Sequence, residues 1–107
     1  PTARAEVVAI RNACRELETF DLSGCTVYTS CEPCPMCLSA LYWAGIERIY
    51  YANTRSDAAA IGFDDAFIYD QIPLAPTART IPSLPLMRAE GLEAFRLWEA
   101  KEDKVEY

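Results

Sequence analysis

The sequence predicts an α/β domain, on two observations. Segments with helical apolar spacing alternate with short strand-like segments along the chain, a pattern typical of layered α/β domains. Three of the five cysteines fall between residues 31 and 37, where a predicted strand gives way to a predicted helix. With 107 residues, of which 51% are hydrophobic, the chain can form one modest core. We therefore expect a single domain over residues 1–107, organised around these cysteines.

Composition excludes several classes of protein. The formal net charge of −6 argues against broad, salt-dependent binding to nucleic acid. No apolar run is long enough to span a bilayer, so we expect no membrane partner. An odd number of clustered cysteines does not suit a secreted disulfide framework and indicates a cytoplasmic protein. The chain opens at Pro1 inside a helical pattern, from which we expect a piece of a longer protein.

The first predicted elements precede the cysteines. Residues 3–17 are expected to form a helix with Glu6 on its buried side, and Cys14 as a packed thiol. Its apolar stripe consists of Val7, Ile10, Cys14 and Leu17. A turn at residues 21–24 and a strand at residues 25–30 follow.

The cysteine segment begins the second helix, which Gly45 is expected to end. Residues 46–52 predict a second strand, after which Ser56 and Asp57 can cap a short helix that runs to residue 60. Residues 62–69 predict a loop and a short helix.

The C-terminal third is predicted to be an extended connection followed by a helix. Prolines interrupt it at residues 73, 76, 82 and 85, and one strand is expected near residues 83–87. The last predicted helix spans residues 91–104.

Cys34 and Cys37 are the strongest candidate site residues. Residues three apart in a first helical turn share a face, so both sulfurs can point at one ion. The helix dipole there favours negative charge and lowers a thiol pKa, and two such thiolates make half of a tetrahedral zinc site. The pair alone would also suit a redox dithiol or two small core residues.

An upstream glutamate favours zinc. Zinc-dependent nucleobase deaminases carry His-x-Glu followed by Pro-Cys-x-x-Cys. Here Glu6 and residues 33–37 match that pattern, while Arg4 stands at the histidine position and the chain contains no histidine. Through residues 1–7, 28–38 and 62–69 and the closing Glu106-Tyr107, the chain resembles the cytidine-deaminase-like superfamily, and within it the bacterial guanine deaminases.

The resemblance implies a fold, a reaction and a set of site residues. It implies a three-layer α/β/α fold, a homodimer whose exchanged C-terminal segment closes the partner's site, and zinc-dependent hydrolysis of guanine to xanthine and ammonia. Carried over to this chain, Cys34 and Cys37 match the metal ligands and Glu6 the catalytic proton shuttle. Asp65 and Tyr107 match groups that contact the purine.

Two departures from the family pattern lead us to expect impaired activity. Arginine stays protonated and cannot donate a lone pair to zinc, so Arg4 would pair with Glu6 or a thiolate, or turn outward. The opening helix and first two strands of the family, with a substrate-binding asparagine, have no counterpart before Pro1. We therefore expect the first remaining strand to be an exposed edge.

Two alternatives remain open at this stage. A tRNA adenosine deaminase or another nucleoside deaminase would share the cysteine motif, although a tRNA binder usually shows a basic stripe that this acidic chain lacks. A non-catalytic oligomerisation module would have kept the fold and lost the metal. Zinc content separates the enzymes from the module, and activity on guanine or on adenosine in a tRNA loop separates the two enzymes.

Overall fold

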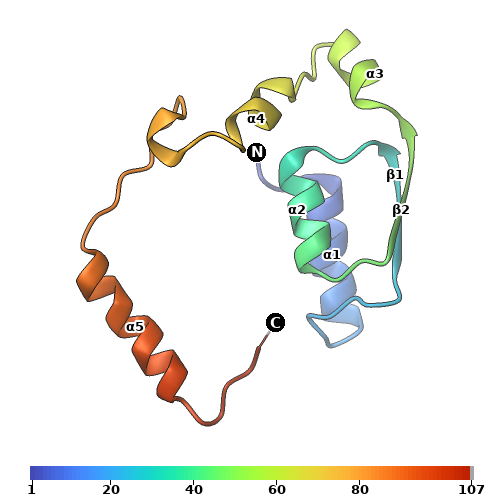
Figure 1. Ribbon diagram of the computed structural model, residues 1–107. Helices are drawn as coiled ribbons and strands as arrows, with labels where there is room; N and C mark the ends of the chain where they lie inside the picture. Colours follow the sequence, from blue (N-terminus) through green and yellow to red (C-terminus); the bar gives the residue numbers. More distant parts are fainter. Residues whose placement is uncertain (107) are drawn as a thin grey trace. The chain divides into compact units, whose positions relative to one another are not determined.

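The structure is a computed structural model that describes residues 1–106. The chain divides into two compact units, Pro1–Asp70 and Gln71–Tyr107, which are considered separately below. Figure 1 traces the order of the elements. The expectation of one domain over residues 1–107 stays a prediction.

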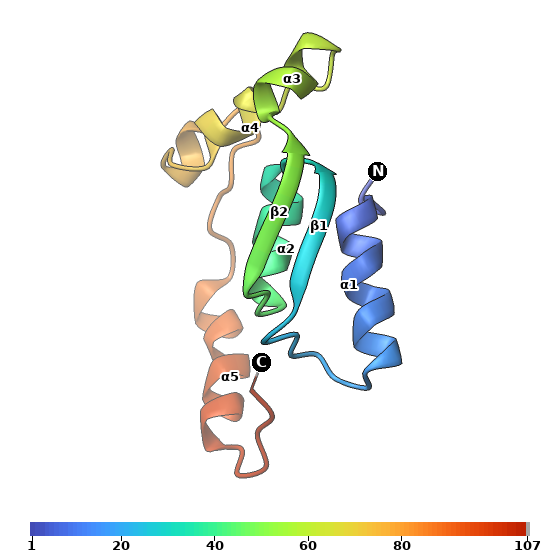
Figure 2. The ribbon, with the colours of Figure 1, turned by 90° about the vertical axis from the view of Figure 1, so that its right-hand side faces the viewer.

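A βαβ arrangement forms the centre of the first unit. Strands β1 (Thr26–Cys31) and β2 (Arg48–Asn53) run parallel, with Thr26 opposite Arg48, and helix α2 (Pro35–Trp43) connects them. Parallel strands need such a crossover. Helix α1 (Ala5–Glu16) and α2 lie on the same face of this sheet in both views (Figures 1 and 2). The predicted α/β class and the order helix, strand, helix, strand are confirmed.

The opposite face of the sheet is open in this unit. Residues of β1 alternate between exposed and half-buried, and Tyr28 stacks on Tyr50 with ring centroids 5.3 Å apart. Tyr28 is 78% exposed. Strand β1 has β2 as its one strand partner among the described residues, as expected of an edge strand. The third layer implied by the resemblance stays a prediction, since α1 and α2 cover one face only.

The core of the first unit lies against α2. The fully buried side chains of this core include Leu22 from the loop before β1 and Cys37 and Leu41 from α2. The Leu22 N–H donates to the carbonyl of Ala44 at 2.8 Å, which ties the loop before β1 to the end of α2. Gly45 ends the helix at φ +76, and a Cβ there would lie 3.0 Å from Asp21 Oδ1, so glycine is required.

Two sequence predictions in this unit need correction. Leu17 is 58% exposed and follows the end of α1, so it does not belong to the apolar stripe. The other predicted members of the stripe, Val7, Ile10 and Cys14, are half-buried. The cap of α3 (Arg55–Ala60) is Thr54 rather than Ser56, because the Thr54 hydroxyl accepts from the Asp57 N–H and the Asp57 carboxylate accepts from the Thr54 N–H. A loop and helix α4 (Ala66–Gln71) then follow, as predicted.

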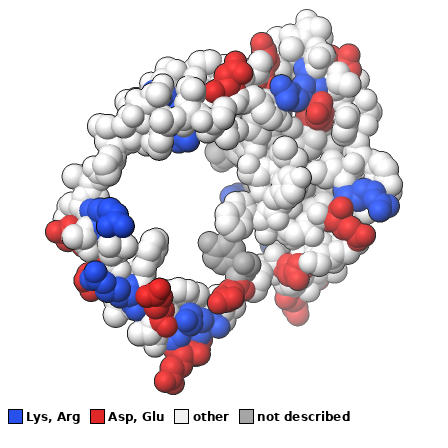
Figure 3. Space-filling view, viewed as in Figure 1, with Lys and Arg blue, Asp and Glu red and all other residues white. Residues whose placement is uncertain are grey.

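The second unit contains a 3₁₀ helix (Pro76–Ala78) and α5 (Arg88–Ala100). The strand predicted at residues 83–87 was wrong: these residues form no strand, because the prolines at 82 and 85 lack N–H donors and Met87 turns left-handed at φ 52. Helix α5 begins three residues earlier than predicted, at Arg88, and carries charges of both signs (Figure 3). None of the described helices is long and apolar enough to cross a membrane.

Candidate functional site

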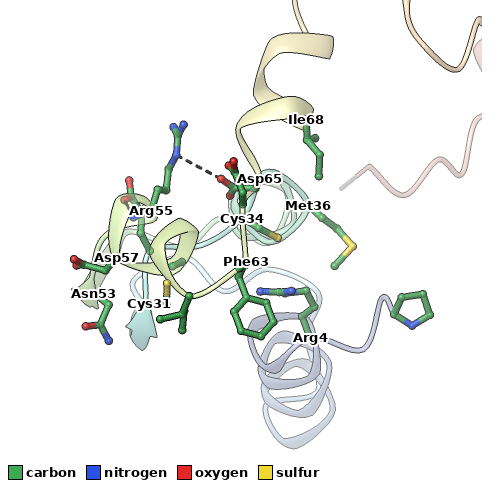
Figure 4. A pocket seen from close by; sticks show the side chains of 16 residues that line it. Arg4, Cys31, Cys34, Met36, Asn53, Arg55, Asp57, Phe63, Asp65 and Ile68 are labelled. Atoms are coloured by element: carbon green, nitrogen blue, oxygen red, sulfur yellow. Dashed lines mark hydrogen bonds and ion pairs between the residues drawn. The ribbon is translucent and has the colours of Figure 1, made fainter.

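A cleft of about 910 Å³ opens in the first unit beside the carboxyl ends of its two strands. Its lining includes Cys31 and Asn53, the last residues of β1 and β2, together with residues of α3 and the loop before α4 (Figure 4). Ligands of open α/β sheets bind at this end of the strands. The cleft is therefore the candidate ligand-binding site of the first unit.

The segment of residues 31–37, called the cysteine turn below, forms one wall of the cleft. Cys34 is the N-cap of α2 and lines the cleft, with Pro35 as the first helical residue, where its missing N–H costs nothing. Cys37 follows one turn later and is completely buried beside Cys34. The prediction that both cysteines begin a helix and approach each other is confirmed.

Glu6 reaches the same cysteine pair from α1. Its carboxylate accepts hydrogen bonds from the Cys37 thiol at 3.4 Å and from the Thr29 hydroxyl at 3.5 Å. Glu6 is half-buried, so its predicted place on the inner side of α1 is confirmed. The structure thus brings together three of the predicted site residues: Glu6, Cys34 and Cys37.

Burial controls the protonation of Cys37. Burial, followed by the interactions with Cys34 and Glu6, raises the pKa of the Cys37 thiol to about 12. The pKa of Cys37 is thus raised, whereas the helix-dipole argument predicted a lowered one, because burial and the neighbouring Cys34 and Glu6 disfavour the thiolate. At neutral pH Cys37 is a thiol that donates to Glu6.

Arg4 lies on the cleft wall. It is the exposed N-cap of α1, and its guanidinium extends into the cleft (Figure 4). Within residues 1–106 it forms no ion pair, so the predicted pairing with Glu6 is not formed. The position that a histidine ligand would take in the deaminase pattern is therefore held by a cation that lines the same cleft as Cys34.

Asp65 lines the cleft from the start of α4. Its carboxylate lies 3.7 Å from Arg55 Nε, and its backbone carbonyl accepts from the N–H of Ile68 at 3.0 Å. Asp65 therefore shares the cleft with Arg4 and Cys34, whereas Glu6 and Cys37 are not among the residues that line it. Tyr107, the other predicted substrate contact, lies outside the described residues.

Sequence reasoning missed Arg55, Glu32 and Thr29. Arg55 approaches Asp65, Glu32 accepts from the Arg55 backbone N–H at 2.9 Å, and Thr29 donates to Glu6. The rule that ligands bind at the carboxyl ends of parallel strands could have drawn attention to Arg55, which follows β2. No motif in the sequence distinguishes Thr29.

The side chains of residues 1–106 do not complete a three-ligand zinc site. Catalytic zinc sites use three protein ligands, and the sequence predicts two, Cys34 and Cys37. Within residues 1–106 no three His, Cys, Asp or Glu side chains are arranged to hold one metal ion. Arg4 cannot be the third ligand, since its guanidinium has no lone pair to donate.

Comparison with known proteins shows what this chain is similar to. Residues 1–53 match the family described as cytidine and deoxycytidylate deaminase zinc-binding region. A guanine deaminase of Bacillus subtilis (strain 168) is 50% identical over 107 residues, which are 100% of this chain and 69% of that protein. The X-ray structure of guanine deaminase from Bacillus subtilis superimposes with a TM-score of 0.95 at 50% identity, over 100% of this chain and 68% of that chain.

A shorter match points to a related class. A tRNA-specific adenosine deaminase of Aquifex aeolicus (strain VF5) is 48% identical over 52 residues, 49% of this chain and 34% of that protein. Zinc is the metal of the matched family. The chain therefore belongs to the cytidine and deoxycytidylate deaminase family and shares the α/β fold of guanine deaminase.

Proposed function

We propose that this chain is a guanine deaminase domain, a zinc-dependent hydrolase that converts guanine to xanthine and ammonia, with turnover impaired by Arg4. The observation that carries the proposal is the cluster of Glu6, Cys34 and Cys37 next to a cleft that also contains Asp65. The 50% identity to a guanine deaminase along the whole chain supports the choice of substrate.

The residues of the chain have separate roles in this proposal. Glu6 carries a proton between water and the base, which a carboxylate can do without binding the metal. Asp65 accepts hydrogen bonds from N–H groups of guanine, and Tyr107 contacts the purine. Cys34 and Cys37 are the thiol ligands for the family's zinc. Arg4 cannot supply the third protein ligand. We also propose a cytoplasmic homodimer that exchanges its C-terminal segments.

The match to tRNA-specific adenosine deaminase favours one competing function, deamination of adenosine in tRNA. The net charge of −6 argues against it, because tRNA binding relies on neutralising phosphates. The second competing function is that of a non-catalytic oligomerisation module. Arg4 favours it, because an arginine at the histidine position cannot bind zinc.

Ligand binding tests the proposal without requiring turnover. Equilibrium dialysis of the chain against guanine should show binding that Asp65→Asn weakens about tenfold, the loss expected for one charge-assisted hydrogen bond. Arg48→Gln, on exposed β2 and outside the cleft lining, is the control. Retention of a tRNA anticodon stem-loop with no binding of guanine would favour the tRNA enzyme. No binding of either would favour the non-catalytic module.

A further inference from the structure

We propose that Arg55 is a positioning residue that fixes the Asp65 carboxylate at the cleft and so sets the preference of the cleft for guanine. The inference rests on the proposed function, because Asp65 is taken there to contact the base. It adds a residue that lies outside the deaminase motif and acts through Asp65.

The backbone of Arg55 is anchored to the cysteine turn. Its N–H donates to Glu32 Oε2 at 2.9 Å, and the Glu32 N–H donates to the carbonyl of Asn53 at 2.8 Å. The preceding residue, Thr54, is fixed by its reciprocal hydrogen bonds with Asp57. Arg55 therefore begins α3 at a position that the cysteine turn and the capping box both define.

The side chain of Arg55 is held between two groups of the α4 region. Its Nε lies 3.7 Å from Asp65 Oδ1, and its guanidinium carbon lies 3.7 Å from the centroid of the Tyr69 ring (Figure 4 shows the ion pair). Cation–π contact with an aromatic face restrains a guanidinium, and the planar guanidinium suits a carboxylate.

The ion pair between Arg55 and Asp65 leaves the Asp65 carboxylate able to accept hydrogen bonds from a ligand. Arg55 Nε is buried and has no hydrogen-bond partner within residues 1–106, since 3.7 Å is ion-pair distance. The Asp65 side chain remains 20% exposed, and its backbone is fixed at the start of α4 by the Ile68 and Tyr69 N–H groups. Arg55 thus attracts the Asp65 carboxylate electrostatically. The carboxylate oxygens of Asp65 still have lone pairs that can accept hydrogen bonds from a base.

The preference follows from the chemistry of the two partners. A carboxylate accepts hydrogen bonds, and guanine presents a ring N–H and an amino group as donors. Hypoxanthine keeps the ring N–H and lacks the amino group. A fixed acceptor discriminates between these bases because a donor it requires is missing from one of them. A carboxylate released from Arg55 would lose that discrimination.

Equilibrium dialysis with guanine and with hypoxanthine tests the inference on the full chain. Arg55→Gln should weaken guanine binding about tenfold and reduce the preference for guanine over hypoxanthine, as Asp65→Asn should. The double variant should bind no more weakly than Asp65→Asn alone, because Arg55 acts through Asp65. Arg55→Lys, which keeps the positive charge, should recover part of the preference. Arg48→Gln, which removes an exposed arginine outside the cleft lining, is the control for loss of one positive charge.

Hydrogen exchange gives a readout that needs no ligand. Arg55→Gln should speed exchange of the Ile68 and Tyr69 amides, which donate to Asp65, and leave the amides of α1 unchanged. Unchanged guanine affinity in Arg55→Gln together with a weakened Asp65→Asn would overturn the inference and leave the proposed function standing. Additive losses in the double variant would also overturn it. If the unmodified chain binds no guanine, the proposed function fails, and unchanged amide exchange would then overturn the inference as well.

Discussion

The hydrogen bond between Glu6 and Cys37 joins side chains 31 positions apart in the sequence. The four-residue spacing from Glu6 to Ile10 predicted that Glu6 lies on the inner side of α1, and the structure confirms it. Its partners Cys37 and Thr29 were not predictable, because no local pattern specifies how α1 packs against α2 and β1. Local register is therefore present in the sequence, whereas long-range pairing is not.

Asp57 gives a pH-dependent prediction at the scale of one residue. The Thr54 backbone N–H, and then its hydroxyl, lower the pKa of the Asp57 carboxyl below its ordinary 3.8. A lowered folded-state pKa means that the ionised form stabilises the fold above 3.8, and this contribution is lost as the pH falls through the lowered pKa.

Urea unfolding of the chain and of Asp57→Asn checks this sign. The difference in free energy of unfolding between them should be largest well above pH 3.8 and shrink below it. Asp70→Asn, which removes an exposed charge outside the capping box, is the control. A difference that grows as the pH falls would contradict the argument.

At the scale of elements, α2 holds the first unit together through its inner face. Leu41 is 1% exposed, whereas the next residue, Tyr42, is 78% exposed. Leu41→Ala should lower the free energy of unfolding by about 2–5 kcal/mol, from lost apolar burial and the cavity left behind. Tyr42→Ala should change it by less than about 0.5 kcal/mol. Equal losses in urea unfolding of the two variants would refute this description of α2.

Element boundaries show where sequence reasoning stops. Gly45 was predicted to end α2 and does, because its positive φ suits few other residues. Thr54 and Ser56 are both good caps, and only the reciprocal hydrogen bonds with Asp57 decide between them. The strand expected at residues 83–87 failed because a strand also needs a partner, which local sequence cannot supply.

At the scale of the whole molecule, the motif predicted part of the site. The spacing of Cys34 and Cys37 and the register of Glu6 placed each residue within its own helix, and only the resemblance to the deaminase motif implied that the three meet. The Arg55–Asp65 pair was not predictable, since it depends on how the loop after α3 brings Asp65 back toward the first residue of α3. Tyr107 stays a prediction.

The apolar surface of the second unit predicts self-association. Phe95, Leu97 and Trp98 of α5 are 70%, 73% and 44% exposed. Exposed apolar side chains in such number mark surfaces that are covered by another element or chain. Sedimentation velocity at micromolar concentration should therefore show a dimer, and deletion of residues 92–107 should yield a monomer. A monomeric full chain, or a deletion variant that still dimerises, would count against the exchange of C-terminal segments.

The zinc content of the purified chain and of Arg4→His tests the central claim most directly. After dialysis against zinc and removal of free metal, the unmodified chain should retain far less than one zinc ion per chain, because two thiols lack a third protein ligand. Arg4→His should retain about one, since a neutral imidazole replaces a fixed cation in the cleft that Cys34 also lines, whereas Arg4→Lys should not. About one zinc ion in the unmodified chain, or none in Arg4→His, would contradict the account.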